Sequence, residues 1–152
     1  MNIKYLCFIL IVFSFISCDN SQKLFYNFKD TQWDFNNPVV FFIDIKDASR
    51  TYDMSLFFYN NLNYPYQNLY IIAETSYQNN ILSTDTLHYD ITDKYGKWLG
   101  EGVGNTKNNY FNYKKKLVFD KTGTYNIVLK HGMRKNPLDG SVTIGLKMIK
   151  ND

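Results

Sequence analysis

Apolar and polar residues alternate along most of the chain after residue 37, with a period of two rather than 3.6. Successive side chains of a strand point to opposite faces of a sheet, so this period is typical of half-buried β-strands. No stretch longer than a turn has a convincing helical period, although residues 131–138 contain a candidate short helix. The pattern predicts strands at residues 38–46, 52–60, 68–77, 85–91, 123–130 and 142–150, and one more strand or a broken pair of strands at residues 108–119.

The same alternation predicts which side chains face the core. Short turns rich in Asn, Asp and Gly separate the strands, a spacing typical of a two-sheet antiparallel β-sandwich, Ig-like or jelly-roll-like. We therefore predict an all-β fold, with one sandwich domain over residues 38–152. The predicted core-facing residues are Phe41, Ile43 and Ile45; Tyr52, Met54, Leu56 and Phe58; Leu87, Tyr89 and Ile91; Tyr125, Ile127 and Leu129; and Val142, Ile144, Leu146 and Met148.

The first 17 residues carry a different pattern, in which one positive charge at Lys4 precedes an apolar run and then small residues. The run is too short for a membrane span, which needs about 20 apolar residues, and the order is typical of an export signal. Cys18 follows directly, in the sequence FISC, which matches the bacterial lipobox. The sequence thus predicts a lipoprotein signal peptide over residues 1–17 and lipid attachment at Cys18.

The alternative is an ordinary secretory signal with an incidental cysteine at its end. Residues 19–152 contain no cysteine, so Cys18 would then be an unpaired thiol on an exported protein, which invites oxidation. The same absence excludes a disulfide framework and a cysteine-ligated metal site from the mature chain. Residues 18–37 are polar with scattered aromatics, and we predict a lipidated tether and a partly docked arm there.

Candidate catalytic chemistry is scarce. His88 and His131 are the two histidines, and we expect them to be surface or half-buried residues rather than metal ligands. Signatures of serine nucleophiles, phosphate-binding loops and calcium loops are absent. The sequence therefore predicts no enzyme activity, no metal and no cofactor. Its formal net charge of +3, or +2 without Lys4, is too small to indicate a nucleic-acid partner.

The segment YDITDKYGKWLGEGVG is the most informative one outside the lipobox. Gly96, Gly100 and Gly102 predict an unusual backbone path, and Trp98 and Leu99 are bulky apolar residues for a polar loop. Two interpretations remain open. Trp98 either folds back to cover the end of the sandwich, or presents an apolar anchor to a partner protein.

A basic run is formed by Lys114, Lys115 and Lys116, with Lys121 close by. Most such runs are solvated hairpin faces. The alternative is a contact with anionic lipid headgroups.

Four segments together resemble the GldH-type gliding-motility lipoproteins: the FISC junction, DKYGKWLGEG, GTYNIVLKHGMRKN and VTIGLKMIK. In this resemblance Cys18 takes the lipidated position and residues 133–136 take the second signature, while the loop signature falls on Gly96, Trp98, Gly100 and Gly102. The resemblance implies a cell-envelope lipoprotein of the gliding machinery, which is tied to a secretion system of the outer membrane. It carries over no catalytic residue.

The expected function is therefore that of a non-enzymatic, membrane-anchored lipoprotein component of the gliding machinery and its associated secretion apparatus. The expected partners are the membrane, through the N-terminal lipid, and other envelope motility or secretion proteins, at the outer membrane facing the periplasm. Candidate partner-binding residues are Trp98, Leu99 and Arg134, whose guanidinium can pair with a carboxylate within the domain or across an interface.

A carbohydrate-binding lipoprotein is the alternative, because aromatic side chains can stack on sugar rings. The 13 tyrosines do not favour it by number alone, since the residue usage is that of an AT-rich coding sequence.

Overall fold

The structure is a computed structural model, and it describes residues 20–151. A 3-10 helix, η2 (Lys29–Thr31), and two short strands that pair with each other, β2 (Gln32–Trp33) and β9 (Leu138–Asp139), accompany the long strands. The long strands are β1 (Ser21–Asn27), β3 (Val39–Ile45), β4 (Thr51–Asn61), β5 (Asn68–Tyr77), β6 (Asn80–Asp90), β7 (Thr106–Val118), β8 (Gly123–His131) and β10 (Ser141–Lys150).

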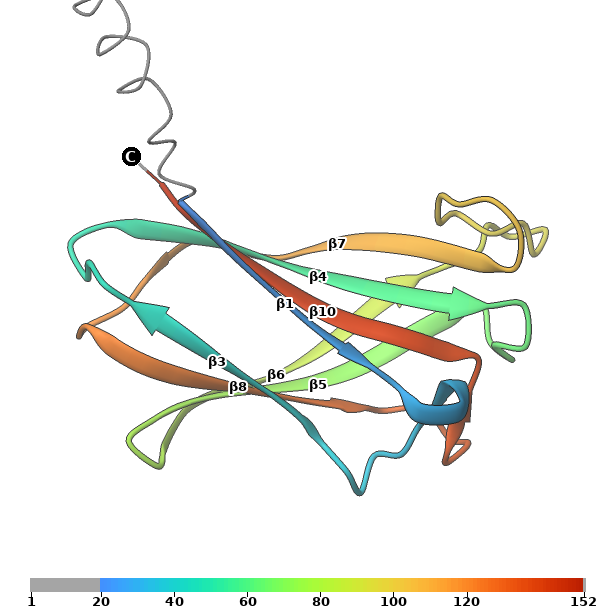
Figure 1. Cartoon of the computed structure of the whole chain (residues 1–152), viewed down its shortest axis with the longest axis horizontal. Helices are drawn as coiled ribbons and strands as arrows, with labels where there is room; N and C mark the ends of the chain where they lie inside the picture. Colours follow the sequence, from blue (N-terminus) through green and yellow to red (C-terminus); the bar gives the residue numbers. More distant parts are fainter. Residues whose placement is uncertain (1–19, 152) are drawn as a thin grey trace, which may run out of the picture.

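The long strands form two antiparallel sheets packed face to face (Figure 1). The first sheet has the order β1-β10-β4-β7, and the second has the order β3-β8-β5-β6. The pairing is nested: β1 pairs with β10, β3 with β8, β4 with β7 and β5 with β6, as in one long hairpin rolled over itself. The predicted two-sheet sandwich is confirmed, and its strand order is that of a jelly roll rather than that of an immunoglobulin domain.

The core lies between the sheets, where the predicted alternation places it. In β3 the side chains of Phe41, Ile43 and Ile45 are buried and those between them are exposed. The predicted core-facing residues of β4 and β8 are also buried. Two kinds of exception occur. Leu87 and Tyr89 are only partly buried because β6 is an edge strand, and Val142 is half-buried beside a register shift at the start of β10.

The segment before residue 38 is part of the sandwich from Ser21 onward. β1 pairs with β10 along its whole length, and Trp33 in β2 is fully buried against the rings of Phe28 and Phe58. These residues thus pack with the sandwich, in the segment where the sequence predicted a tether and a partly docked arm, because burial removes their aromatic rings from water. The predicted signal peptide and Cys18 lie outside the described residues.

Residues 131–138 do not form the candidate short helix. They form an irregular loop that is held by side-chain hydrogen bonds, such as the one from the backbone N–H of Met133 to Nδ1 of His131 (3.3 Å). The segment then enters β9 at Leu138. The predicted strand at 108–119, in contrast, is one strand, β7.

β7 is an edge strand whose pairing with β4 is irregular. The register shifts on both sides of Met54, and Lys116 has a φ of 53°, in the left-handed region. The backbone N–H of Lys116 donates to Oδ1 of Asp53 (2.9 Å). Lys114 faces the other sheet and its Nζ lies 2.7 Å from Oδ2 of Asp85, so it is not a solvated member of the basic run.

Aromatic side chains cross the outer face of the first sheet in one row. Phe25, Gly145, Phe57 and Tyr110 lie opposite one another on its strands, and we call them the aromatic row. The ring centroid of Phe57 lies 5.4 Å from that of Phe25 and 5.1 Å from that of Tyr110. Glycine in the row makes room for Phe25, because a Cβ on Gly145 would lie 2.5 Å from Cδ1 of that ring.

Candidate functional site

Loops cluster at the end of the sandwich where β4, β6 and β8 finish, opposite the start of β1 (Figure 1). Because antiparallel neighbours run in opposite directions, segments far apart in the sequence meet there. Both motifs that the sequence singled out lie in these loops. We call this region the loop end, and define it as residues 62–67, 91–105 and 132–140.

The loop of residues 62–67 connects the other two. The carbonyl of Gln67 accepts hydrogen bonds from the backbone N–H groups of Ile91 (2.9 Å) and Thr92 (3.1 Å). On the other side, the hydroxyl of Tyr66 accepts one from the backbone N–H of Lys135 (3.2 Å). This segment therefore joins the two other loops, which we call the tryptophan loop (residues 91–105) and the arginine loop (residues 132–140).

A tight turn over residues 93–97 begins the tryptophan loop. Oδ1 of Asp93 accepts the backbone N–H groups of Tyr95 (2.8 Å) and Lys97 (2.9 Å), and the N–H of Asp93 donates to the carbonyl of Lys97 (2.8 Å). Gly96 has a φ of 83°, a conformation that glycine adopts without steric cost. The Asp93 carboxylate thus serves the backbone of the turn.

The next two glycines bring the loop close to β7. A Cβ on Gly100 would lie 2.7 Å from Oδ1 of Asn109, and a Cβ on Gly102 would collide with the carbonyl of Thr106. Between them, Glu101 and Asn108 exchange two backbone hydrogen bonds. Gly100 thus makes room for the buried Asn109 side chain, and Gly102 makes room for the backbone of β7.

Trp98 and Leu99 have different surroundings. Trp98 is partly buried and packs against the core, which agrees with the interpretation that it covers the end of the sandwich. Leu99 is 57% exposed, and Val103 near the tip of the loop is fully exposed. Within this loop Trp98 therefore contacts the core, whereas the side chain of Leu99 is exposed.

In the arginine loop, three of the four residues of the sequence MRKN are used by the fold. Sδ of Met133 accepts the backbone N–H of Tyr70 (3.2 Å), and Lys135 forms an ion pair with Asp139. Asn136 precedes a cis proline and donates from Nδ2 to Oδ1 of Asp34 (2.8 Å). This last bond joins the loop to the turn that follows β2.

Arg134 is the exception. It is exposed, and within residues 20–151 its guanidinium has no hydrogen-bond or ion-pair partner. It borders a cavity of about 320 Å³ whose other walls include Tyr66, Tyr70 and Met133. A free cation beside an aromatic hollow is an arrangement that suits a carboxylate-bearing partner.

His131 lies beneath the arginine loop and is almost fully buried. Its Nε2 lies 3.1 Å from Oδ1 of Asn136, and its Nδ1 accepts from the N–H of Met133. These partners assign the proton to Nε2 of a neutral ring, because an amide oxygen can only accept and a backbone N–H can only donate. Burial lowers the pKa of His131 below its ordinary value of 6.5, although the bond to Asn136 and the nearby Asp34 oppose the shift.

We expect the protein to lose stability as the pH falls below about 6.5, because the unfolded chain then binds a proton that buried His131 does not. The loss is at most about 1.4 kcal/mol per pH unit for one group. Urea unfolding between about pH 7.5 and 5.5 measures it. His131→Gln should flatten the dependence, while His88→Gln, at an exposed position, should not. Equal slopes for all three proteins would contradict this account.

The two histidines do not meet. His88 is exposed on β6 and stacks on Tyr70 with a centroid distance of 4.5 Å, whereas His131 is buried, deeper than the surface or half-buried position expected for it. Within residues 20–151, no three His, Cys, Asp or Glu residues are grouped so that they could hold a metal ion. In the same part of the chain no helix has the length and apolarity to cross a membrane.

Sequence analysis missed two polar pairs that position the loop end. Nδ2 of Asn109 donates to Oδ1 of Asn60 (2.9 Å) inside the sandwich, behind Gly100. The pair formed by Asp34 and Asn136 closes the other side. Asparagine is abundant in this chain, so nothing in the pattern distinguishes these residues from solvated ones.

Fold and loops together define an all-β sandwich domain that carries both sequence motifs in loops at one end. Comparisons with known proteins agree with the resemblance noted in the sequence. The sequence model of the GldH lipoprotein family matches residues 21–148. The chain is similar to the gliding motility lipoprotein GldH homolog of Christiangramia forsetii, with 32% identity over 95% of this chain and 94% of that protein.

It is also similar to the gliding motility lipoprotein GldH of Flavobacterium johnsoniae, with 25% identity over 90% of this chain and 89% of that protein. The chain belongs to the GldH lipoprotein family, which is associated with gliding motility.

Proposed function

We propose that this chain is a non-enzymatic, lipid-anchored component of the gliding machinery and of its associated secretion apparatus, and that it binds another envelope protein through the loop end. Family membership supports the link to motility and to the cell envelope. We place the domain at the outer membrane, on the periplasmic side.

The anchor is the lipid on Cys18. Support comes from the FISC junction and from the short apolar run after Lys4. Several acyl chains on one residue hold a protein on a bilayer durably, since each buried methylene contributes about 0.8 kcal/mol. After cleavage, Cys18 is the new N-terminus and its thiol is no longer open to oxidation.

Arg134 is the single observation that carries the partner-binding proposal. Its neighbours in MRKN are committed to the fold, so the sequence builds a rigid loop that leaves one guanidinium without a partner in the described chain. Leu99, in the tryptophan loop, is a second exposed side chain of the loop end. Arginine is enriched at protein interfaces and among their hot spots, and an exposed apolar side chain adds surface that a partner can bury.

Three polar groups in or beside the loop end support a non-enzymatic role. The Asp93 carboxylate holds a turn, Asp34 accepts hydrogen bonds from asparagines, and both ring nitrogens of His131 are engaged. The bond from Asn136 is the main cause that lowers the pKa of Asp34 below its ordinary range. Each group therefore has a structural task, and none is poised as a general base.

The aromatic row favours a second candidate, carbohydrate binding. Phe25 and Tyr110 are about half exposed, on either side of buried Phe57, and rings of this kind can stack on sugars. The residues next to the row, Asn27 and Thr143, are hydrogen-bonded to each other (2.7 Å). We rank this function second because the row lies on a sheet face, away from both loop motifs.

We expect Arg134→Ala and Leu99→Ala to reduce recovery of the partner from native envelopes about tenfold or more, the effect of losing about 1.4 kcal/mol. Gliding should be lost in parallel. Because both side chains are exposed, the free energy of unfolding should change by no more than about 0.5 kcal/mol. Pull-down, motility assays and thermal melts measure the three quantities.

Arg50→Ala is the matched control, since Arg50 is an exposed arginine at the opposite end that lies 3.8 Å from Asp47. It should leave partner recovery unchanged. If both loop-end variants glide and recover partners normally, the loop end has no recognition role. Selective glycan-array binding that is lost in Phe25→Ala would then favour the second candidate.

A further inference from the structure

The distance between Cys18 and the first strand is short. β1 begins at Ser21, three residues after Cys18. Fully extended, three residues span at most about 11 Å. If Cys18 carries acyl chains, as proposed above, the start of β1 must lie within about 11 Å of the bilayer surface. This tether is too short to let the sandwich turn freely above the membrane.

The end of the sandwich where β1 starts also contains the turns 46–50 and 119–122 and the end of β10, and we call it the anchor end. Figure 1 shows these turns grouped on the side where the chain enters the sandwich, with the loop end on the other side. β10 has 10 residues between the two ends. At about 3.3 Å per residue, they are roughly 33 Å apart.

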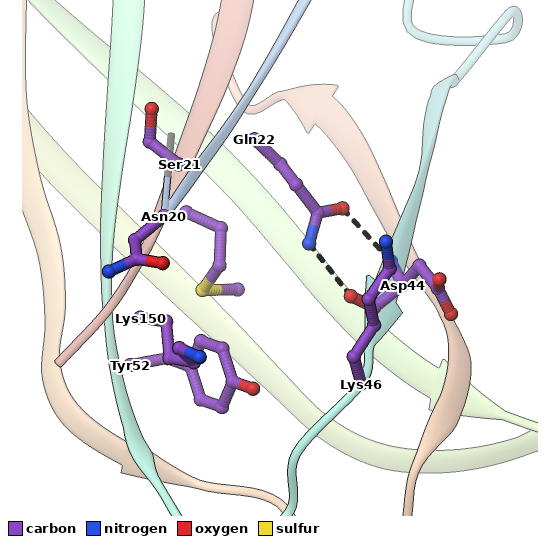
Figure 2. Close-up of a pocket in the computed structure, with 8 residues that line it drawn as sticks. Asn20, Ser21, Gln22, Asp44, Lys46, Tyr52 and Lys150 are labelled. Atoms are coloured by element: carbon purple, nitrogen blue, oxygen red, sulfur yellow. Dashed lines mark hydrogen bonds between the residues drawn. The ribbon is translucent and has the colours of Figure 1, made fainter. Parts of the chain in front are cut away.

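A cavity opens at the anchor end between the two sheets. Its volume is about 310 Å³, and it is lined by the first residues of β1, the ends of β3 and β10, and the buried side chains of Tyr52 and Met148. Gln22 bridges the sheets on one side: its Nε2 donates to the carbonyl of Asp44 (2.7 Å), and its Oε1 accepts from the Asp44 N–H (3.1 Å), as Figure 2 shows. The cavity thus has a fixed polar wall and an apolar floor.

Lys46 and Lys150 line the same cavity from opposite sheets. Within residues 20–151 neither ammonium group forms an ion pair. Hydrogen bonds from Ser49 are the main cause that lowers the pKa of nearby Asp47, and the charge of Lys150 lowers it further. The Asp44 carboxylate points away from Tyr52 (Figure 2). Two lysines that line one cavity suit a phosphate group, which ammonium groups bind as point charges.

Within residues 20–151, the anchor end carries six basic side chains and four carboxylates. Phosphate is the anion that any phospholipid surface supplies there, and lysine binds it as a point charge. The basic residues are Lys46, Arg50, Lys115, Lys116, Lys121 and Lys150, and the carboxylates are those of Asp44, Asp47, Asp53 and Asp120.

We propose that the anchor-end cavity receives the phosphate of a membrane phospholipid between Lys46 and Lys150, so that the anchor end sits on the bilayer and the loop end points away from it. This inference rests on the proposed lipidation of Cys18. It adds a second attachment point beside the acyl chains. Together the two points fix which surface of the domain is presented to partners.

Collisional quenching in nanodiscs tests the proposal on the processed full-length protein. The mature chain has no cysteine after Cys18, so Ala48→Cys at the anchor end and Val103→Cys at the loop end each create one free thiol for a fluorescent label. With nitroxide on the lipid headgroups, we expect several-fold stronger quenching at position 48 than at position 103. Equal quenching, or stronger quenching at 103, would overturn the orientation.

A second measurement tests the cavity. Lys46→Gln together with Lys150→Gln should remove most of the excess quenching that anionic lipid adds at position 48, while Lys94→Gln with Lys97→Gln at the loop end should not. Inorganic phosphate at matched ionic strength should not produce the excess quenching at position 48 that anionic lipid produces. If it does, the cavity is a site for free anions and the proposal fails. Unchanged quenching in the Lys46→Gln, Lys150→Gln double variant would show that the cavity does not contact the lipid.

Intact mass of the same samples separates this proposal from the one on which it rests. A mass with acyl chains on Cys18 and equal quenching at both positions refutes the orientation and leaves the anchor in place. A mass without acyl chains refutes both.

Discussion

Trp33→Ala is expected to lower the free energy of unfolding by about 3 to 5 kcal/mol, a large share of the stability of a domain of this size. The ring is fully buried, and its centroid lies 5.0 Å from that of Phe28 and 5.5 Å from that of His131. Removing the ring leaves a cavity between Phe28 and His131. Urea unfolding of the purified protein measures the loss.

Trp33→Phe is the matched control. Nε1 of Trp33 is buried and has no hydrogen-bond partner within residues 20–151. The substitution by phenylalanine therefore removes an unsatisfied donor and keeps much of the aromatic surface. We expect it to cost less than half of the alanine loss. A small effect of the alanine variant would show that the segment before residue 38 contributes little to the fold.

Cys18→Ala should abolish lipid attachment and leave an unprocessed or unanchored precursor. We expect the effect to be complete rather than graded, because in the proposed anchor the acyl chains are attached through that thiol. Metabolic labelling with a fatty-acid analogue, followed by membrane fractionation, measures both consequences. Gliding should be lost along with the anchor.

Cys7→Ala provides the comparison, since Cys7 lies inside the predicted signal peptide and its thiol is discarded on cleavage. This variant should be labelled as strongly as the parent. Label retained on the Cys18→Ala protein would show that the FISC junction is not a lipid-attachment site.

Much of the sandwich could be predicted from the sequence because its central strands are amphipathic. β3 and β8 bury every second side chain, so their period of two is visible without a structure. β1 could not be found in this way. In that strand Phe25 and Tyr26 are both about half exposed, and the three consecutive residues Leu24, Phe25 and Tyr26 hide the alternation. Its partner β10 lies at the other end of the chain, a pairing that no local pattern reveals.

The loop end was predictable in part for a similar reason. Gly96 and Gly102 have positive φ values that restrict the choice of residue, and the sequence therefore marks the turns they form. The sequence marks Arg134 as a charged residue near a strand end, but it does not show that the guanidinium has no partner within residues 20–151. That isolation depends on Met133, Lys135 and Asn136 turning to distant partners, which only the three-dimensional arrangement can show.

The irregular edge of β7 bears on how one copy of the protein avoids pairing with the sheet of another copy. An open edge strand offers unpaired backbone groups to a neighbour, and proteins limit this hazard with bulges and lysines. β7 has both, because its register shifts around Met54 coincide with Lys115 and Lys116. The basic run, which the sequence presents as a solvated face or a headgroup contact, therefore also discourages one copy from extending its sheet with the edge of another.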